Sequence, residues 1–185
     1  AIADRDEAWE REDPDAVDAD LADAVVRVVA STADQETWDE LRRRAAAART
    51  AQDTLRHQGA LADAQDPALV LRFCELCLTD EIRSQDALFL LARALRNRYA
   101  AAEVWAFLTE RWDEITTRFP SSTVPRLIDG IRGVSDRELA TAIATFLAEH
   151  PIKQGTKPVQ QHLERMWVTV ALADRVRGEL GAALA

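Results

Sequence analysis

Apolar side chains recur every three or four positions through the middle of the chain, and this spacing constrains the fold more than any other feature. Between positions 99 and 119 it places five large side chains on one face of a helix: Trp105, Leu108, Trp112, Ile115 and Phe119. The preceding stretch has the same spacing at Leu88, Leu91 and Leu95. We therefore expect two helices packed as a buried hairpin, with a polar corner at residues 96–98.

The composition supports helices in the rest of the chain. The sequence has 185 residues, enough for one domain with a sizeable core, and contains only 6 Gly and 6 Pro. Val and Ile seldom alternate with polar residues, so strands have little support. We predict an all-α chain in which residues 1–185 form one helical-repeat domain.

Capping residues mark where several helices begin. Capping pairs at helix N-termini are expected at Thr32 with Gln35, Thr50 with Asp53, Asp66 with Pro67, and Ser135 with Glu138. An earlier helix is expected from Pro14, and the last helix is expected to fray after Gly178 and Gly181.

Alternate helices begin at nearly constant intervals. Starts near Thr32, Asp66, Tyr99 and Ser135 are separated by 34, 33 and 36 residues. A near-constant period in this range is typical of stacked helical hairpins. The sequence therefore predicts a HEAT-like superhelix of about ten helices, stacked as antiparallel hairpins.

The net charge and the apolar pattern argue against some classes of binding partner, and the N-terminus bears on whether the domain is complete. The formal net charge is -9, which argues against a nucleic-acid partner and gives no reason to expect an anionic membrane surface. No apolar run approaches the ~20 residues of a membrane helix, and the charged start is no signal peptide. Because an initiator Met is absent, we expect a domain truncated at its N-terminal side.

Two cysteines and three consecutive arginines raise the question of a metal site and of a nucleic-acid site. Cys74 and Cys77 lie on one helix face and could be half of a metal site, but no second pair exists. We expect two small, reduced core residues, which suits a cytoplasmic protein. Residues 42–44 are expected on a solvated helix face rather than at a nucleic-acid site.

No catalytic constellation is present in the sequence. The histidines are His57, His150 and His162, and no pair of them has the spacing of a helical zinc site. His162 is expected on a solvated face. The sequence also lacks a Gly-rich phosphate loop and a nucleophile elbow. We therefore assign no catalytic and no metal-binding residue to this chain.

The candidate binding residues are four polar groups beside apolar runs: Arg83, Gln85, Arg96 and Arg126. One interpretation is that they satisfy backbone carbonyls at buried helix ends. The other is that they face a concave groove and bind the carboxylate or backbone of a peptide, for which arginine is suited. In the second case Arg83, Gln85 and Arg96 should lie near one another.

The run DEIRSQD at residues 80–86 matches a known family pattern, and the match is strong over residues 60–170. These residues resemble the C-terminal domain of the gluzincin zinc aminopeptidases, the family of aminopeptidase N, puromycin-sensitive aminopeptidase and the endoplasmic-reticulum aminopeptidases. Other matching segments are residues 66–69, 105–108, 112–114, 126–128 and 146–151, and Gln160-Gln161 with Glu164. Thr169 and Leu172 depart from the family pattern.

The resemblance implies a helical superhelix that encloses the substrate chamber and packs on the catalytic domain of the same polypeptide. It also implies that an arginine matching Arg96 helps to hold the far end of longer peptides. Zinc is expected in the catalytic domain of the parent enzyme, and no cofactor is expected here. The high content of Ala, Arg and Asp favours a bacterial origin.

Our leading hypothesis is a non-catalytic C-terminal domain of a cytoplasmic zinc metallo-aminopeptidase, in contact with peptide substrates. The alternative is a stand-alone helical-repeat module for protein interactions. A self-contained enzyme is the third choice, because the chain offers no active site of its own.

Overall fold

A computed structural model describes residues 19–152 and 154–184. Across these residues it contains ten α-helices, one 3₁₀ helix and no strand, which confirms the all-α prediction. The helices are α2 (Ala19–Ser31), α3 (Gln35–Ala47), α4 (Ala51–Leu61), α5 (Pro67–Cys77), α6 (Ser84–Leu95), α7 (Ala101–Glu110), α8 (Trp112–Arg118), α9 (Val124–Ile128), η2 (Asp129–Gly133), α10 (Arg137–Glu149) and α11 (Thr156–Leu184).

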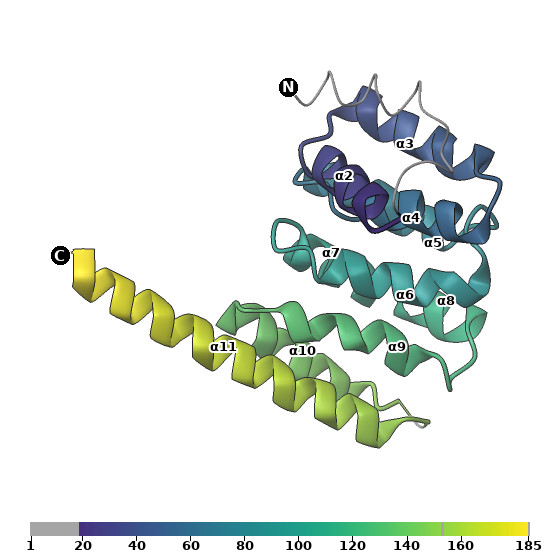
Figure 1. The fold of residues 1–185 in the computed structure, drawn as a ribbon. Coiled ribbons are helices and arrows are strands. Elements are labelled where there is room, and N and C mark those ends of the chain that lie inside the picture. The colour runs from purple at the N-terminus through teal and green to yellow at the C-terminus, as the bar shows by residue number, and fades with distance from the viewer. Residues whose placement is uncertain (1–18, 153, 185) are drawn as a thin grey trace.

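The helices form two layers that stack from the N-terminal to the C-terminal end (Figure 1). One layer, called the front layer here, consists of α2, α4, α6, α9 with η2, and α11, each in contact with the next. The back layer consists of α3, α5, α7 with α8, and α10. Neighbouring helices of the two layers pack against each other as predicted for stacked hairpins.

The predicted N-cap residue is correct for two helices and wrong for two others. Thr50 and Asp66 accept hydrogen bonds from the first turns of α4 and α5. The caps of α3 and α10 are Asp34 and Asp136, whose carboxylates replace the predicted Thr32 and Ser135. An ionised oxygen interacts better than a hydroxyl with the positive end of a helix dipole. Pro14 lies outside the described residues.

The central hairpin is buried as predicted, but its second helix is interrupted. Arg111 has φ -103 and ψ 16, which separates α7 from α8. The five large side chains of this stretch are nevertheless all buried. Phe146 of α10 meets Trp105 and Trp112 edge-on at centroid distances of 5.6 Å and 5.3 Å. These aromatic contacts fix α10 against α7 and α8.

The last helix is longer than the sequence predicts, because α11 continues past Gly178 to Leu184. Its inner residues Met166 and Val170 are fully buried, and α11 packs on η2, α9 and α10. Its C-terminal end projects beyond the stack (Figure 1). None of the described helices combines the length and the apolar character that crossing a bilayer requires.

The polar surface and the cysteines have ordinary structural roles. The three arginines at 42–44 pair with Glu81 and Glu40, so they belong to a solvated, ion-paired face as predicted. Both thiols are buried and free. Burial raises the pKa of Cys74 to about 12 and that of Cys77 well above its ordinary value, so both stay protonated and unreactive.

Candidate peptide-binding groove

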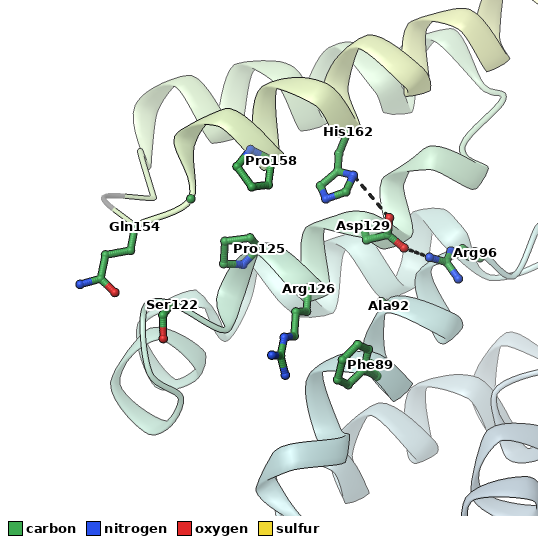
Figure 2. A pocket seen from close by; sticks show the side chains of 11 residues that line it. Phe89, Ala92, Arg96, Ser122, Pro125, Arg126, Asp129, Gln154, Pro158 and His162 are labelled. Carbon is green, nitrogen blue, oxygen red and sulfur yellow. Dashed lines mark ion pairs between the residues drawn. The ribbon is translucent and has the colours of Figure 1, made fainter.

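The front layer is hollowed where α6, α9 and α11 meet. A pocket of about 480 Å³ opens there, with Phe89 and Ala92 on α6, Pro125 and Arg126 on α9, and Pro158 on α11 among its lining residues. Figure 2 shows these side chains around a common space. The pocket combines an apolar lining with a few charged groups, which is typical of ligand sites.

Arg126 is the most available cation in this pocket. It is exposed, and its guanidinium carbon lies 5.0 Å from the ring centroid of Phe89. No acidic partner is found for it within the described part of the chain. A stacked guanidinium keeps its hydrogen-bond donors free at its edges. Arg126 can therefore donate to a carboxylate that enters the pocket.

Asp129 organises the opposite side of the pocket. Its carboxylate forms an ion pair with Arg96 and another, at 2.7 Å, with Arg132 (Figure 2 shows the first). The imidazole Nδ1 of His162 is 3.4 Å from Oδ1 of Asp129, but it is buried without a hydrogen-bond partner. One aspartate therefore neutralises only one of two neighbouring arginines.

The expectation that His162 lies on a solvated face is wrong. Its side chain is 18% exposed, because α11 packs over η2 and turns the imidazole into the pocket. Burial, together with Arg132, Arg165 and Arg96, lowers the pKa of His162. The ring is therefore neutral at pH 7 and leaves the charge of the pocket to the arginines.

The structure brings together two of the four predicted residues and separates the other two. Arg96 and Arg126 line the same pocket. Arg83 and Gln85 are exposed at the N-terminal end of α6, whereas Arg96 follows its C-terminal end. A helix of 12 residues is about 18 Å long. The expected proximity of Arg83 and Gln85 to Arg96 is therefore not found.

Sequence reasoning missed Phe89, Asp129 and His162. The sequence could have pointed to Phe89, because this residue lies one position off the apolar stripe of α6. In the structure its side chain is 53% exposed. A large aromatic residue on the polar face of a helix is a candidate contact for a ligand. Asp129 and His162 are 33 residues apart, and the sequence alone gives no reason to pair them.

The pocket does not resemble a metal centre. The described residues contain no group of three or more His, Cys, Asp and Glu side chains that could hold a metal ion. The arrangement offers arginine donors beside an aromatic ring, which suits binding of an anion on a peptide.

The fold and the pocket define a helical-repeat domain with arginines in a hollow of its front layer. The family model of the ERAP1-like C-terminal domain matches residues 1–166. The chain therefore belongs to the ERAP1-like C-terminal domain family, the non-catalytic part of M1 aminopeptidases. The family membership agrees with the resemblance seen in the sequence and does not favour a stand-alone interaction module.

Similar proteins include Aminopeptidase M1-B of Oryza sativa subsp. japonica, which is 30% identical over 161 residues, 84% of this chain and 18% of that protein. Aminopeptidase M1 of Arabidopsis thaliana is 26% identical over 153 residues, 81% of this chain and 17% of that protein. The chain spans less than a fifth of the length of these relatives. These relatives are plant proteins and do not support the predicted bacterial origin.

Proposed function

We propose that this domain encloses the substrate chamber of a zinc metallo-aminopeptidase and contacts the far end of the peptide substrate. In this proposal the hydrolytic chemistry and the zinc belong to a catalytic domain of the same polypeptide, on which this domain packs. The parent enzyme is proposed to act in the cytoplasm. A bacterial source is also part of the proposal and has only the composition in its favour.

The observation that carries the proposal is Arg126 stacked on Phe89 in a pocket of about 480 Å³. The guanidinium is exposed and unpaired among the described residues, so binding a carboxylate costs no internal ion pair. The apolar ring, with Pro125 and Pro158 beside it, can cover a peptide side chain. A peptide C-terminus presents both groups, a carboxylate and an adjacent side chain.

Arg96 has a secondary role in this proposal. Its ion pair with Asp129 must loosen before it can bind a second carboxylate. Arg126 is therefore the primary anchor, and Arg96 sets the positive field around it. Arg83 and Gln85 stay candidates for a separate contact near the other end of α6.

The test compares long and short substrates in the parent enzyme. Arg126→Ala is expected to slow cleavage of peptides of about ten residues while leaving chromogenic aminoacyl amides unaffected. One charge-assisted hydrogen bond contributes about 1.5–3 kcal/mol, so the loss in kcat/KM should be about tenfold or more. Arg96→Ala should have a smaller effect of the same kind.

Two controls make the result specific. Amidation of the peptide C-terminus should lower kcat/KM in the unchanged enzyme and have no further effect in the Arg126→Ala variant. Arg49→Ala removes an exposed arginine outside the pocket and should change neither substrate. Equal cleavage of long and short substrates by Arg126→Ala would show that this pocket does not hold the peptide.

A further inference from the structure

Asp63 is shared by two arginines on the front layer. Its carboxylate accepts a two-point contact from Arg93, with an Nε–Oδ1 distance of 3.0 Å and an Nη2–Oδ2 distance of 2.5 Å. Arg27 of α2 lies beside the same carboxylate, with Nε 3.4 Å from Oδ2. Arg27 also has a second acidic partner, because its Nη1 lies 3.8 Å from Oδ2 of Asp23. Asp63 is therefore shared by two arginines, one of which has a further carboxylate beside it.

Positive charge is in excess at Asp129, where Arg96 and Arg132 surround one carboxylate. Arg93 and Arg96 are three residues apart on α6 and its C-cap, so the two clusters lie side by side. Burial and the neighbouring Arg132 and Arg93 lower the pKa of Arg96. The two arginine pairs therefore form one crowded region of positive charge.

Three hollows adjoin along this layer and form what we call the arginine groove. The first spans α2, α4 and α6, the second is the pocket described above, and the third lies between η2 and α11. Arg96 lines all three, and Phe89 lines the first two. The charged residues that line them are Arg27, Asp63, Asp86, Arg93, Arg96, Arg126, Asp129, Arg132 and Arg165.

The charge of the arginine groove is opposite to that of the chain. Six arginines and three aspartates line it, an excess of three positive charges in a chain of net charge -9. A hollow on α10, in the back layer, has one arginine and two glutamates instead. The positive charge is therefore concentrated on the face that the peptide is proposed to contact.

The length of the groove matches an extended peptide. Neighbouring helices pack about 8–10 Å apart, so the five elements of the front layer span about 35 Å. An extended chain of about ten residues covers this distance. Leu55 and Phe89 are exposed along the way and provide apolar contacts.

We infer that the arginine groove selects peptides with acidic side chains in their C-terminal part. This rests on the proposed function and names the substrate class of the same site. The unbalanced arginines attract Asp and Glu side chains, repel Lys and Arg, and act over the length of the groove. A long nucleic acid is disfavoured by the net negative charge of the rest of the chain.

The test measures binding of three labelled decapeptides to this chain by fluorescence anisotropy. The peptides differ only at three positions, which carry Asp, Asn or Lys, and all have a free C-terminal carboxylate. The Asp peptide is expected to bind about five- to tenfold more tightly than the Asn peptide. The Lys peptide should bind most weakly, and raising the salt to about 0.5 M should shrink these differences.

The variant for this test removes charge from both ends of the groove and leaves Arg126 in place. Arg27→Gln with Arg165→Gln changes two exposed side chains, and Asp63 keeps Arg93 as its partner. The variant should bind the Asp and Asn peptides almost equally well. The matched control is Arg49→Gln with Arg175→Gln, which removes the same charge outside the groove and should keep the preference.

The outcomes separate this inference from the proposed function. Equal binding of all three peptides, with loss of binding on C-terminal amidation, would overturn the acidic preference and keep the peptide site. Preference for the Lys peptide would also overturn it. Failure of every peptide to bind would overturn both proposals. Displacement of the Asp peptide by an oligonucleotide of equal charge would show that the groove recognises polyanions instead.

Discussion

Trp112 shows how one aromatic residue can join several helices. Its side chain is 7% exposed and meets Phe146 of α10 edge-on. Replacing it with Ala would leave a cavity between α8 and α10. Large aromatic-to-alanine changes in a core cost about 3–5 kcal/mol.

Trp112→Ala is therefore expected to lower the free energy of unfolding by about 3–5 kcal/mol in urea or heat denaturation. Leu172→Ala is the control, because that side chain is 56% exposed on α11. It should change stability by no more than about 0.5 kcal/mol. A loss below about 1 kcal/mol for Trp112→Ala would mean that the residue contributes little packing.

His57 gives the stability a dependence on pH. The residue is 6% exposed, its Nδ1 donates to the carbonyl of Asp53 at 2.8 Å, and its Nε2 has no hydrogen-bond partner. Burial lowers the pKa of His57, and the nearby Arg44 and Arg56 add to the effect. In the unfolded chain the pKa returns to about 6.5, so that state binds the proton first as the pH falls.

Stability should therefore fall as the pH drops below about 6.5, and His57→Leu should make this fall shallower. The measurement is urea unfolding of both proteins between pH 7.5 and pH 5. Leu172→Ala, which changes an exposed side chain and removes no titratable group, should keep the original slope. Identical slopes for the His57→Leu variant and the unchanged chain would contradict this assignment.

At the scale of the elements, Gly155 sets the start of α11. Its φ of 106° lies in a region that L-residues rarely adopt, and a Cβ there would lie 2.3 Å from Cγ of Pro125. The left-handed backbone and the clash with a rigid ring both oppose a side chain. Gly178, within the same helix, has nothing within 4 Å of the position that a Cβ would take.

Gly155→Ala is expected to destabilise the chain by about 2–4 kcal/mol. Gly178→Ala should instead stabilise it by about 0.5–1 kcal/mol, because alanine is the better helix former. The free energy of unfolding of each variant, measured by denaturation, tests these two expectations. Equal effects of the two substitutions would show that the backbone at Gly155 does not require glycine.

The sequence predicted the elements well where local signals decide them. Thr50 and Asp66 marked two helix starts correctly, and the spacing of the central aromatics gave the buried face. The break at Arg111 was missed, since the apolar spacing continues across it. The caps at Asp34 and Asp136 were missed because nearby hydroxyl residues offered competing capping boxes.

The site was harder to predict, because its residues come together only through packing between helices. Arg96 and Arg126 were selected as arginines beside apolar runs, which is a local property. Asp129 and His162 meet only because α11 lies over η2. Arg83 was expected near Arg96 only because both are arginines beside apolar runs. The two residues lie at opposite ends of α6, and the length of this helix separates them.

For the whole molecule, the family assignment makes a prediction about metal and activity. The purified chain is expected to hold no stoichiometric zinc and to hydrolyse no aminoacyl amide. Peptide hydrolysis needs an activated water and stabilisation of the oxyanion, which a zinc aminopeptidase obtains from its metal ligands and general base. Metal analysis and an amidase assay check both points.

If this domain acts as proposed above, removing it from the parent enzyme should impair cleavage of long peptides more than cleavage of small amides. The control is the Arg126→Ala variant, which should share the defect with long peptides without opening the chamber. One tightly held zinc per purified chain, or activity that survives repurification and chelator treatment, would contradict the assignment of catalysis to another domain.

The packing of each helix with near neighbours along the chain has a consequence for synthesis. The principal contacts of α3, α4 and α5 involve only α2 to α7, so this half can be assembled before the rest leaves the ribosome. The exception is α11, which covers η2, α9 and α10 and is synthesised after them. Until it does, the apolar surface that receives Met166 and Val170 stays open to chaperones. Release of the nascent chain from them should therefore coincide with the docking of α11.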